Sequence, residues 1–432
     1  MPRFKAREIM HDNPVVGVVR DVAGSGLPDI LTGPLVWSGA NLKDRDSYTL
    51  RLSTEDIKEI EAALATFKST TMVKLTAMTG LGLNGDEVSQ TNFPLPNLAS
   101  RLSEAAETLH DGRGFVVISG LDASRYSVED GTVLYLGLAE YVADVRGLQD
   151  KKGNVLSHIT SSKIWNVPAE QRHGIHSSKA LLGLSEPQVR GADAPWPQPF
   201  HNDMGCDILA LQVRHSAHSG GYTYLSSAWT LFNTLVREEP EVAVSLLTSN
   251  WPVQISGRPS RHYLAPAFAI HDGRLMVSMD PNRFGRHPSS GDAEIPVLNA
   301  AQKHALERVS VVARKTELQL RLERGDLVFL NNWAMLHRRD AYEDGKNSSR
   351  HIVRLWLRST RLGWSVPPQM LPPWQAAYGE TSETKARIYA LYPMAIYMVP
   401  KYSAGSAAFM IEDSEESDGD LMIKGSARIS RW

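Results

Sequence analysis

The sequence predicts an α+β fold that is mainly β, with helices inserted between short strands and flanking them. From about residue 150 to 360, short apolar or alternating runs are separated by glycine, proline and other turn-forming residues. This pattern is typical of a β-sandwich or barrel. The runs are Ile208–Val213, Tyr222–Leu225, Phe268–Ile270, Arg274–Met279, Asp326–Leu330 and Ile352–Leu357. Helical periodicity appears between them, at about 227–248 and 298–314.

The N-terminal third favours helices around one buried strand. Residues 14–50 are rich in glycine, proline and turn formers, and are expected to form a non-repetitive arm around short strands. Ser53 to Asp56 supplies a capping hydroxyl and early acidic residues, so a helix should begin there. Further elements are expected as a helix over Asn97–Asp111, a buried strand within Gly112–Gly120 and a helix over 131–146.

The composition excludes several classes of partner and site. Forty-six basic and 48 acidic residues among 432 give a formal charge of −2, so nothing attracts nucleic acid or an anionic membrane globally. The single cysteine, Cys206, excludes an intrachain disulfide and any multi-cysteine metal site. The N-terminus lacks the apolar core of a secretory signal, and the apolar stretch Ile388–Val399 is too short to span a bilayer. We therefore expect a cytoplasmic location and no membrane partner.

Two histidines and one carboxylate form the most informative pattern in the sequence. His201 and Asp203 are two residues apart, so their side chains leave the same face of an extended strand. His337 follows the β run Asp326–Leu330 through Asn331–Trp333, as expected of a ligand at a strand end or turn. Two imidazoles and a carboxylate are the ligand set of mononuclear non-haem iron, which leaves coordination positions open. Each histidine taken singly is more often structural, and the pattern gains weight from the segments downstream.

Four segments, in this order, resemble the TauD/TfdA-like branch of Fe(II)/2-oxoglutarate-dependent dioxygenases, especially its longer fungal members. They are His201-Asn202-Asp203, Gly220-Gly221-Tyr222-Thr223, the run Gly325–Asn332 that ends at His337, and Arg350–Arg354. The strand within Gly114–Gly120 also resembles the N-terminal core strand of the family. The likeness runs from about 110 to 360, and none of these segments identifies a substrate.

The resemblance implies a three-part chain. We expect an N-terminal arm and helices that pack on the core (1–109), a double-stranded β-helix (jelly-roll) catalytic domain (110–365) and a C-terminal extension (366–432). The extension contains an acidic, serine-bearing run, Glu412–Asp420, which is expected to be a solvated flexible segment.

The resemblance also assigns the cofactors. It implies that His201, Asp203 and His337 are the catalytic Fe(II) ligands, and that 2-oxoglutarate and O2 are co-substrates. Arg350 would anchor the remote carboxylate of 2-oxoglutarate, because the planar guanidinium matches a carboxylate in shape and charge. Thr223 would supply a hydroxyl beside it.

The expected substrate contacts are fewer. Arg354 lies four residues after Arg350, so it should face the same side of one strand. In relatives the matching arginine meets an anionic group of the substrate, which implies an anionic substrate here. Ser157 and His158 are further candidates, since relatives place substrate contacts in that region.

The implied reaction is oxidation of an unactivated C–H bond of a small anionic molecule, an amino acid or amino-acid-derived metabolite. Hydroxylation, desaturation and ring closure stay open, each with release of succinate and CO2. Competing interpretations are a catabolic dioxygenase of an organic acid or sulfonate, a non-catalytic cupin-like binding protein and a zinc hydrolase. A nucleic-acid demethylase would need a basic groove, which the near-neutral chain does not predict. A homo-oligomer is neither predicted nor excluded.

Overall fold

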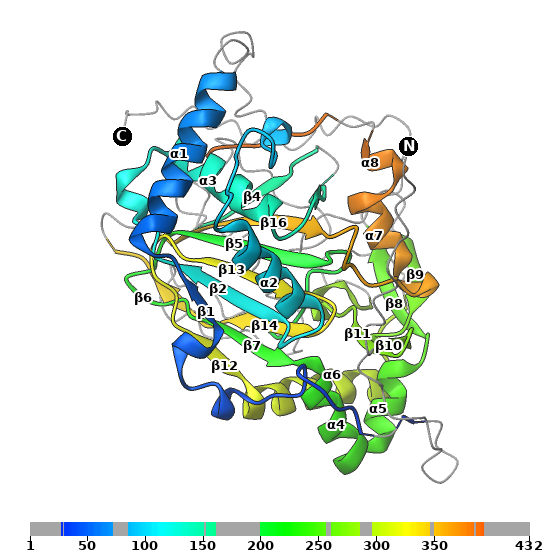
Figure 1. Cartoon of the computed structure of the whole chain (residues 1–432). Coiled ribbons are helices and arrows are strands. Elements are labelled where there is room, and N and C mark those ends of the chain that lie inside the picture. Colours follow the sequence, from blue (N-terminus) through cyan, green and yellow to red (C-terminus); the bar gives the residue numbers. More distant parts are fainter. Residues whose placement is uncertain are drawn as a thin grey trace, which may run out of the picture.

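The computed structural model describes residues 27–28, 30–71, 85–150, 153–160, 199–255, 261–285, 296–345, 350–383 and 386–392. Within these ranges, strands form the centre of the molecule and helices lie around them (Figure 1). The expected mixture of strands with inserted and flanking helices is confirmed. None of the helices in these ranges is both long and apolar enough to cross a bilayer. The acidic run Glu412–Asp420 lies outside the described residues. So does the part of the expected arm at 14–50 that precedes residue 27.

The larger sheet contains seven strands in the described part of the chain. Its order is β1-β2-β13-β5-β16-β3, and β4 also pairs with β16. The strands are β1 (Thr49–Arg51), β2 (Phe115–Ser119), β3 (Val145–Arg146), β4 (Leu156–Thr160), β5 (Ile208–His215), β13 (Leu327–Asn331) and β16 (His351–Arg358). β1 and β2 are parallel, whereas β13, β5 and β16 pair antiparallel with their neighbours.

A smaller sheet of three strands has the order β12-β7-β14, formed by Leu318–Leu320, Thr223–Ser227 and Met335–Arg339. Here one expectation is corrected. His337 does not lie at the end of the strand that contains Asp326–Leu330 but in the middle of β14, in the other sheet. The turn at residues 332–334 moves the chain from the larger sheet to the smaller one, and an apolar run alone does not reveal such a change of sheet.

Three further pairs of short strands complete the described β structure. They are β6 with β15 (Ser219–Gly220 and Tyr342–Glu343), β8 with β9 (Trp251–Ile255 and Arg261–Ala265) and β10 with β11 (Phe268–His271 and Arg274–Val277). Of these, the sequence predicted only the strands near 268–279.

The predicted helices are present with two differences, and two short helices after residue 370 were not predicted. The helices are α1 (Thr54–Thr71), α2 (Ala99–His110), α3 (Val128–Glu140), α4 (Ala228–Glu238), α5 (Pro240–Leu247), α6 (Ala300–Thr316), α7 (Leu371–Tyr378) and α8 (Glu380–Glu383). The expected helix over 227–248 is two helices, because Pro240 lacks an N–H and begins a new helix at its first position. The helix expected over 131–146 ends at Glu140, before β3.

The larger sheet is buried on both faces, and the alternation of its side chains decides which face holds the site. On β5, Leu209 and Leu211 face one hydrophobic cluster and Ile208 and Ala210 face the other. The cluster that contains Ile208 and Ala210 includes apolar side chains of α1, α2 and α3 and marks the first face of the sheet. The cluster that contains Leu209 and Leu211 includes those of the smaller sheet and of α4, α5 and α6 and marks the second face. The site described below lies on the second face.

The first face also holds a histidine cluster around the buried ring of His158. His158 Nδ1 lies 2.8 Å from His351 Nε2, and His158 Nε2 lies 2.8 Å from the carbonyl oxygen of Ala390. The ring of His215 stacks on His351 at a centroid distance of 6.4 Å. Burial lowers the pKa of His158 to about 4. Burial, then the charges of His158, Arg214 and His215, lowers the pKa of His351 to about 2.

These lowered pKa values predict that stability falls in mild acid. Unfolded histidines take up protons below about pH 6.5, whereas His158 and His351 in the folded chain do so only well below that. As the pH falls below 6.5, each of these two histidines therefore lowers the free energy of unfolding by up to about 1.4 kcal/mol per pH unit. Urea denaturation at pH 7.5 and 5.5 measures this loss. It should shrink in His351→Gln and stay unchanged in His304→Gln, an exposed histidine on α6; equal losses in both variants would contradict the assignment.

Candidate metal centre and its pocket

Two histidines far apart in the sequence are held together by their own backbones. The His201 N–H donates to the His337 carbonyl oxygen at 3.0 Å, and the His337 N–H donates to the His201 carbonyl oxygen at 2.8 Å. Side chains of such an antiparallel pair leave the backbone on the same side. Their imidazole centroids are accordingly 4.2 Å apart.

Asp203 completes the cluster with one of its two carboxylate oxygens. Its Oδ1 lies 3.9 Å from His201 Nε2, and ligand atoms of all three residues lie within 4.8 Å of one another. Its Oδ2 accepts hydrogen bonds from Arg354 Nη1 at 2.9 Å and Trp356 Nε1 at 3.0 Å. The carboxylate is therefore oriented by its second oxygen, and Oδ1 is left to face the histidines.

Two fully buried asparagines fix the loop that bears these ligands. The Asn332 side chain accepts from the Asp203 N–H at 3.0 Å and donates to the carbonyl oxygens of Asp203 and Cys206, both at 2.7 Å. The Asn202 side chain donates to Val277 O and Asn332 O and accepts from Met279 N, at 2.7, 2.9 and 2.6 Å. Sequence reasoning assigned no role to Asn332, although an asparagine pair directly after a wholly apolar strand was a usable signal.

The protonation of the histidines suits metal binding. His201 Nδ1 lies 2.9 Å from the carbonyl oxygen of Pro199; since a carbonyl only accepts, Nδ1 carries the proton and Nε2 keeps its lone pair. Burial, then the charge of His201, lowers the pKa of His337 to about 3. His337 Nδ1 has no hydrogen-bond partner among the described residues, so no nearby acceptor stabilises a protonated ring there. Two imidazoles and a carboxylate fit Fe(II) with open coordination positions.

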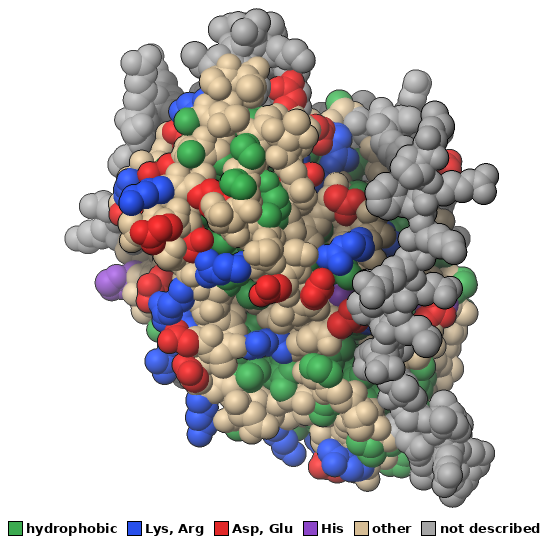
Figure 2. Space-filling view, viewed as in Figure 1, with side chains coloured by type: hydrophobic (Ala, Val, Ile, Leu, Met, Phe, Trp, Pro, Cys, Tyr) green, Lys and Arg blue, Asp and Glu red, His purple; other side chains and the backbone are tan. Residues whose placement is uncertain are grey.

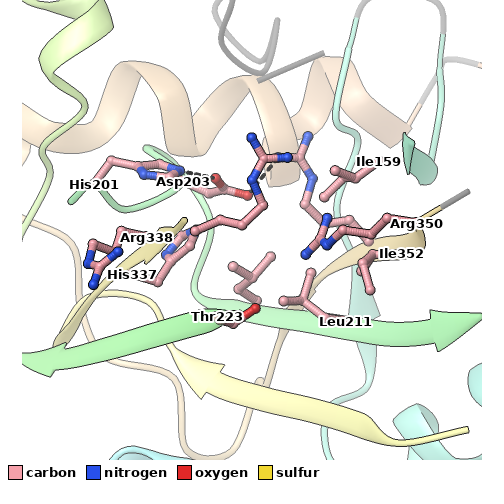
Figure 3. Close-up of a pocket in the computed structure, with 12 residues that line it drawn as sticks. Ile159, His201, Asp203, Leu211, Thr223, His337, Arg338, Arg350 and Ile352 are labelled. Atoms are coloured by element: carbon pink, nitrogen blue, oxygen red, sulfur yellow. Dashed lines mark hydrogen bonds and ion pairs between the residues drawn. The ribbon is translucent and has the colours of Figure 1, made fainter. Parts of the chain in front are cut away.

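A pocket leads away from these ligands. The larger sheet contributes aliphatic side chains, including those of Leu211, Ile159 and Ile352, and the smaller sheet contributes Thr223. Figure 3 shows the three ligands on one side of the pocket and Arg350 on the other. The pocket thus has a candidate metal-binding end and a cationic end, and aliphatic side chains line the space between them.

Arg350 provides a buried positive charge that forms no ion pair with the described residues. Its side chain forms no hydrogen bond or ion pair with any described residue, and its guanidinium carbon lies 5.6 Å from the Tyr342 ring centroid. Burial, then the charge of Arg339, lowers its pKa to about 10. Gly221, at φ +71°, leaves room for this arginine, because a Cβ there would lie 3.0 Å from Arg350 Cδ. A buried charge is costly unless a counter-charge meets it, so this end of the pocket suits a carboxylate.

Arg354 lies at the metal end of the pocket and is already engaged by the protein. Besides its bond to Asp203, its Nε donates to Gln149 Oε1 at 2.7 Å. Gln149 in turn donates to the carbonyl oxygens of Val155 and Arg354, at 2.5 and 2.9 Å. Only Nη2 of the guanidinium makes no hydrogen bond to the described residues. The sequence suggested neither the bond to Asp203 nor the role of Gln149.

The candidates on β4 divide between the two faces of the sheet. Ser157 is the register partner of Arg354 and shares the face of Ile159, which lines the pocket. His158 points to the other face, where its ring nitrogens are hydrogen-bonded to His351 and to the carbonyl oxygen of Ala390. The structure therefore brings Ser157, but not His158, to the side of the metal ligands.

Comparison with known proteins agrees with this geometry. Residues 77–356 match the family of the taurine catabolism dioxygenase TauD and TfdA. The taurine hydroxylase-like protein SAT17 of Stachybotrys chartarum is 27% identical over 84% of this chain and 89% of its own. The FR-33289 synthase of Streptomyces rubellomurinus is 25% identical over 76% and 90%. A crystal structure of an asparagine oxygenase has the same fold, with a TM-score of 0.51 and 16% identity over 72% of this chain and 93% of its own.

The family match covers more than half of the chain and includes the three ligands, Thr223, Arg350 and Arg354. The silent-protein and zinc-hydrolase interpretations are thereby replaced by one enzyme class. The chain belongs to the TauD/TfdA family, and it is a non-haem iron dioxygenase that uses Fe(II), 2-oxoglutarate and O2.

Proposed function

We propose that this enzyme oxidises an unactivated C–H bond of a small anionic metabolite, an amino acid or a derivative of one. The observation that supports this most strongly is the charge of the pocket. Arg350 is buried and forms no ion pair with a described residue. Arg354 donates to Gln149 through Nε and to Asp203 through Nη1, and its Nη2 makes no hydrogen bond to the described residues. Two arginines at separate positions suit two different carboxylates, one from the co-substrate and one from the substrate.

The co-substrate occupies the pocket lengthwise in this proposal. Arg350 pairs with the remote carboxylate of 2-oxoglutarate, and the Thr223 hydroxyl donates to the same group. Leu211 and Ile352 contact its methylene carbons and keep water away from the ion pair, which strengthens it. The keto-acid end then lies towards His201, Asp203 and His337.

Fe(II) held by these three residues would supply the redox chemistry that couples 2-oxoglutarate decarboxylation to oxidation of the substrate. The protein contributes positions and protonation states. Asp203 offers one oxygen because Arg354 and Trp356 occupy the other, which keeps coordination positions open. The buried amides of Asn202 and Asn332 hold the ligand loop rigid, so the reacting groups are oriented before they meet.

The substrate is placed beside Arg354 and Ser157. Arg354 Nη2 is directed to an acidic group of the substrate, while Nη1 stays on Asp203. An α-amino acid offers such a group, and the asparagine oxygenase of similar fold was crystallised with a hydroxylated amino acid and succinate. His158 takes no part, because its ring faces the opposite side of the sheet. Oxidation of another organic acid or of a sulfonate would use the same arginine and is the alternative outcome of the screen below.

We also propose that the two sheets enclosing the pocket form the double-stranded β-helix expected over 110–365. The pocket is lined from both sheets, by β5 and β16 on one side and β7 and β14 on the other. The preceding arm and helices and the following segment would then support this core from outside.

Turnover with a panel of acids tests the proposal directly. The full-length protein, incubated with Fe(II), 2-oxoglutarate and O2, should release succinate, and an accepted amino acid should accelerate that release. Succinate and oxidised product are quantified by mass spectrometry. Zinc should not replace iron, and oxygen should be required. Acceleration by sulfonates or simple organic acids alone would select the catabolic alternative. No succinate with any acid in the panel would defeat the proposal.

Removal of the cationic end should affect the co-substrate alone. Arg350→Ala takes away a charge proposed to bind the remote carboxylate directly, so the affinity for 2-oxoglutarate should fall by about 30-fold or more. Titration calorimetry on the Mn(II)-loaded protein measures it. Affinity for Mn(II) itself should not change, because Arg350 touches none of the ligands. An unchanged 2-oxoglutarate affinity would contradict the assignment.

Arg354 can be separated from the ligand that it orients. Arg354→Ala and Trp356→Phe each remove one hydrogen bond from Asp203 Oδ2, so each should weaken Mn(II) binding by about 10- to 100-fold. Only Arg354→Ala should also abolish the acceleration by the anionic substrate at saturating metal, with 2-oxoglutarate binding still measurable. Equal loss of the substrate response in both variants would mean that Arg354 acts only through Asp203.

A further inference from the structure

A second buried arginine lies at the Arg350 end of the pocket. Arg339 is two residues after His337 on β14, so both side chains leave the same face of the strand. Arg339 is also the direct register partner of Thr223 on β7. Arg339 lines the pocket together with Thr223 and Arg350, and only 7% of its surface is exposed.

The neighbouring arginine, Arg338, is already paired with an acidic residue. Arg338 leaves the opposite face of β14 and forms a two-pronged ion pair with Glu317, with Nε–Oε2 and Nη2–Oε1 distances of 2.7 Å. It also lies over the Tyr224 ring at 3.7 Å. Arg338 also borders the pocket beside His337 (Figure 3), but its guanidinium is held by Glu317, whereas Arg339 lies on the face of the strand that bears His337.

One aromatic ring connects Arg339 to Arg350. The guanidinium carbons of Arg339 and Arg350 lie 4.8 and 5.6 Å from the centroid of the Tyr342 ring. The Tyr342 hydroxyl is hydrogen-bonded to Arg339. After burial, the charge of Arg339 contributes to the lowered pKa of Arg350, while Asp340 and Asp344 act on both arginines in the opposite direction. The ring screens the two cations, but it supplies no negative charge.

We propose that Arg339 and Arg350 together form a two-cation site for the remote carboxylate of 2-oxoglutarate, with Thr223 beside them, and that Arg339 makes the enzyme selective for dicarboxylate oxoacids. This rests on the proposed function of the pocket. Two like charges in a buried site repel each other, and an anion between them relieves that repulsion as well as forming its own bonds. An oxoacid without the remote carboxylate gains neither effect.

The experiment compares two oxoacids that differ only at the remote end. 2-Oxopentanoate has a methyl group where 2-oxoglutarate has the carboxylate. Their dissociation constants are measured by titration calorimetry on the full-length, Mn(II)-loaded protein, for the wild type and for Arg339→Gln. The ratio of the two affinities should fall by about tenfold or more in Arg339→Gln, because a charge-assisted hydrogen bond is lost for one ligand only. Arg339→Lys should retain part of the ratio.

Each other outcome overturns the proposal. If both oxoacids weaken equally, Arg339 only supports the fold of the pocket. If the ratio is unchanged while the substrate response falls, Arg339 serves the substrate instead. If even the wild type does not prefer 2-oxoglutarate, the co-substrate site itself is wrong, which distinguishes failure of the proposed function from failure of Arg339 alone. Arg361→Gln, an exposed arginine beside Glu107, controls for the loss of one positive charge.

Discussion

The hydrogen-bonded pair of His201 and His337 is the constraint on which the rest of the site depends. It joins the segment before β5 to β14, an edge strand of the smaller sheet, so the two imidazoles meet by backbone geometry and not by side-chain contact alone. The carboxamides of Asn202 and Asn332 then fix the short loop that follows His201, which places Asp203 beside both rings. A metal site built this way is rigid before any ion binds.

The electrostatics of the pocket follow from burial on this rigid frame. Burial keeps His337 neutral and therefore able to ligate. The same burial makes cations costly, so each buried arginine needs a counter-charge. Arg354 finds one in Asp203, whereas Arg350 finds none within the described chain. The pocket is thus complementary to anions at two places, and one of them coincides with the group that orients a metal ligand. In the proposed function, Arg354 would couple metal affinity to substrate recognition for that reason.

Much of the fold was predictable because local patterns decided it. Capping residues and helical periodicity located α1, α2 and α6, and apolar runs located β2, β5, β13 and β16. The short strands β8, β9 and β14 were missed, since they lack a distinctive run and are stabilised by their partners. Pro240 was visible in the sequence, yet its effect of dividing one expected helix into two was overlooked. For the site, the predicted ligands and Arg350 lie around one pocket, but Asn332, Gln149 and Arg339 were not assigned roles.

By itself, the sequence determined the kinds of group present: two imidazoles, a carboxylate, a glycine pair before Thr223 and spaced arginines. These are enough to indicate iron and a dicarboxylate, because the chemistry of each group belongs to its side chain. Only the tertiary structure decided which groups face one another. It turned His158 away from the pocket, bonded Arg354 to Asp203 and set Arg339 opposite Thr223. The physical reason is that the facing of a strand residue depends on register and on pairing between distant segments, which no local pattern encodes.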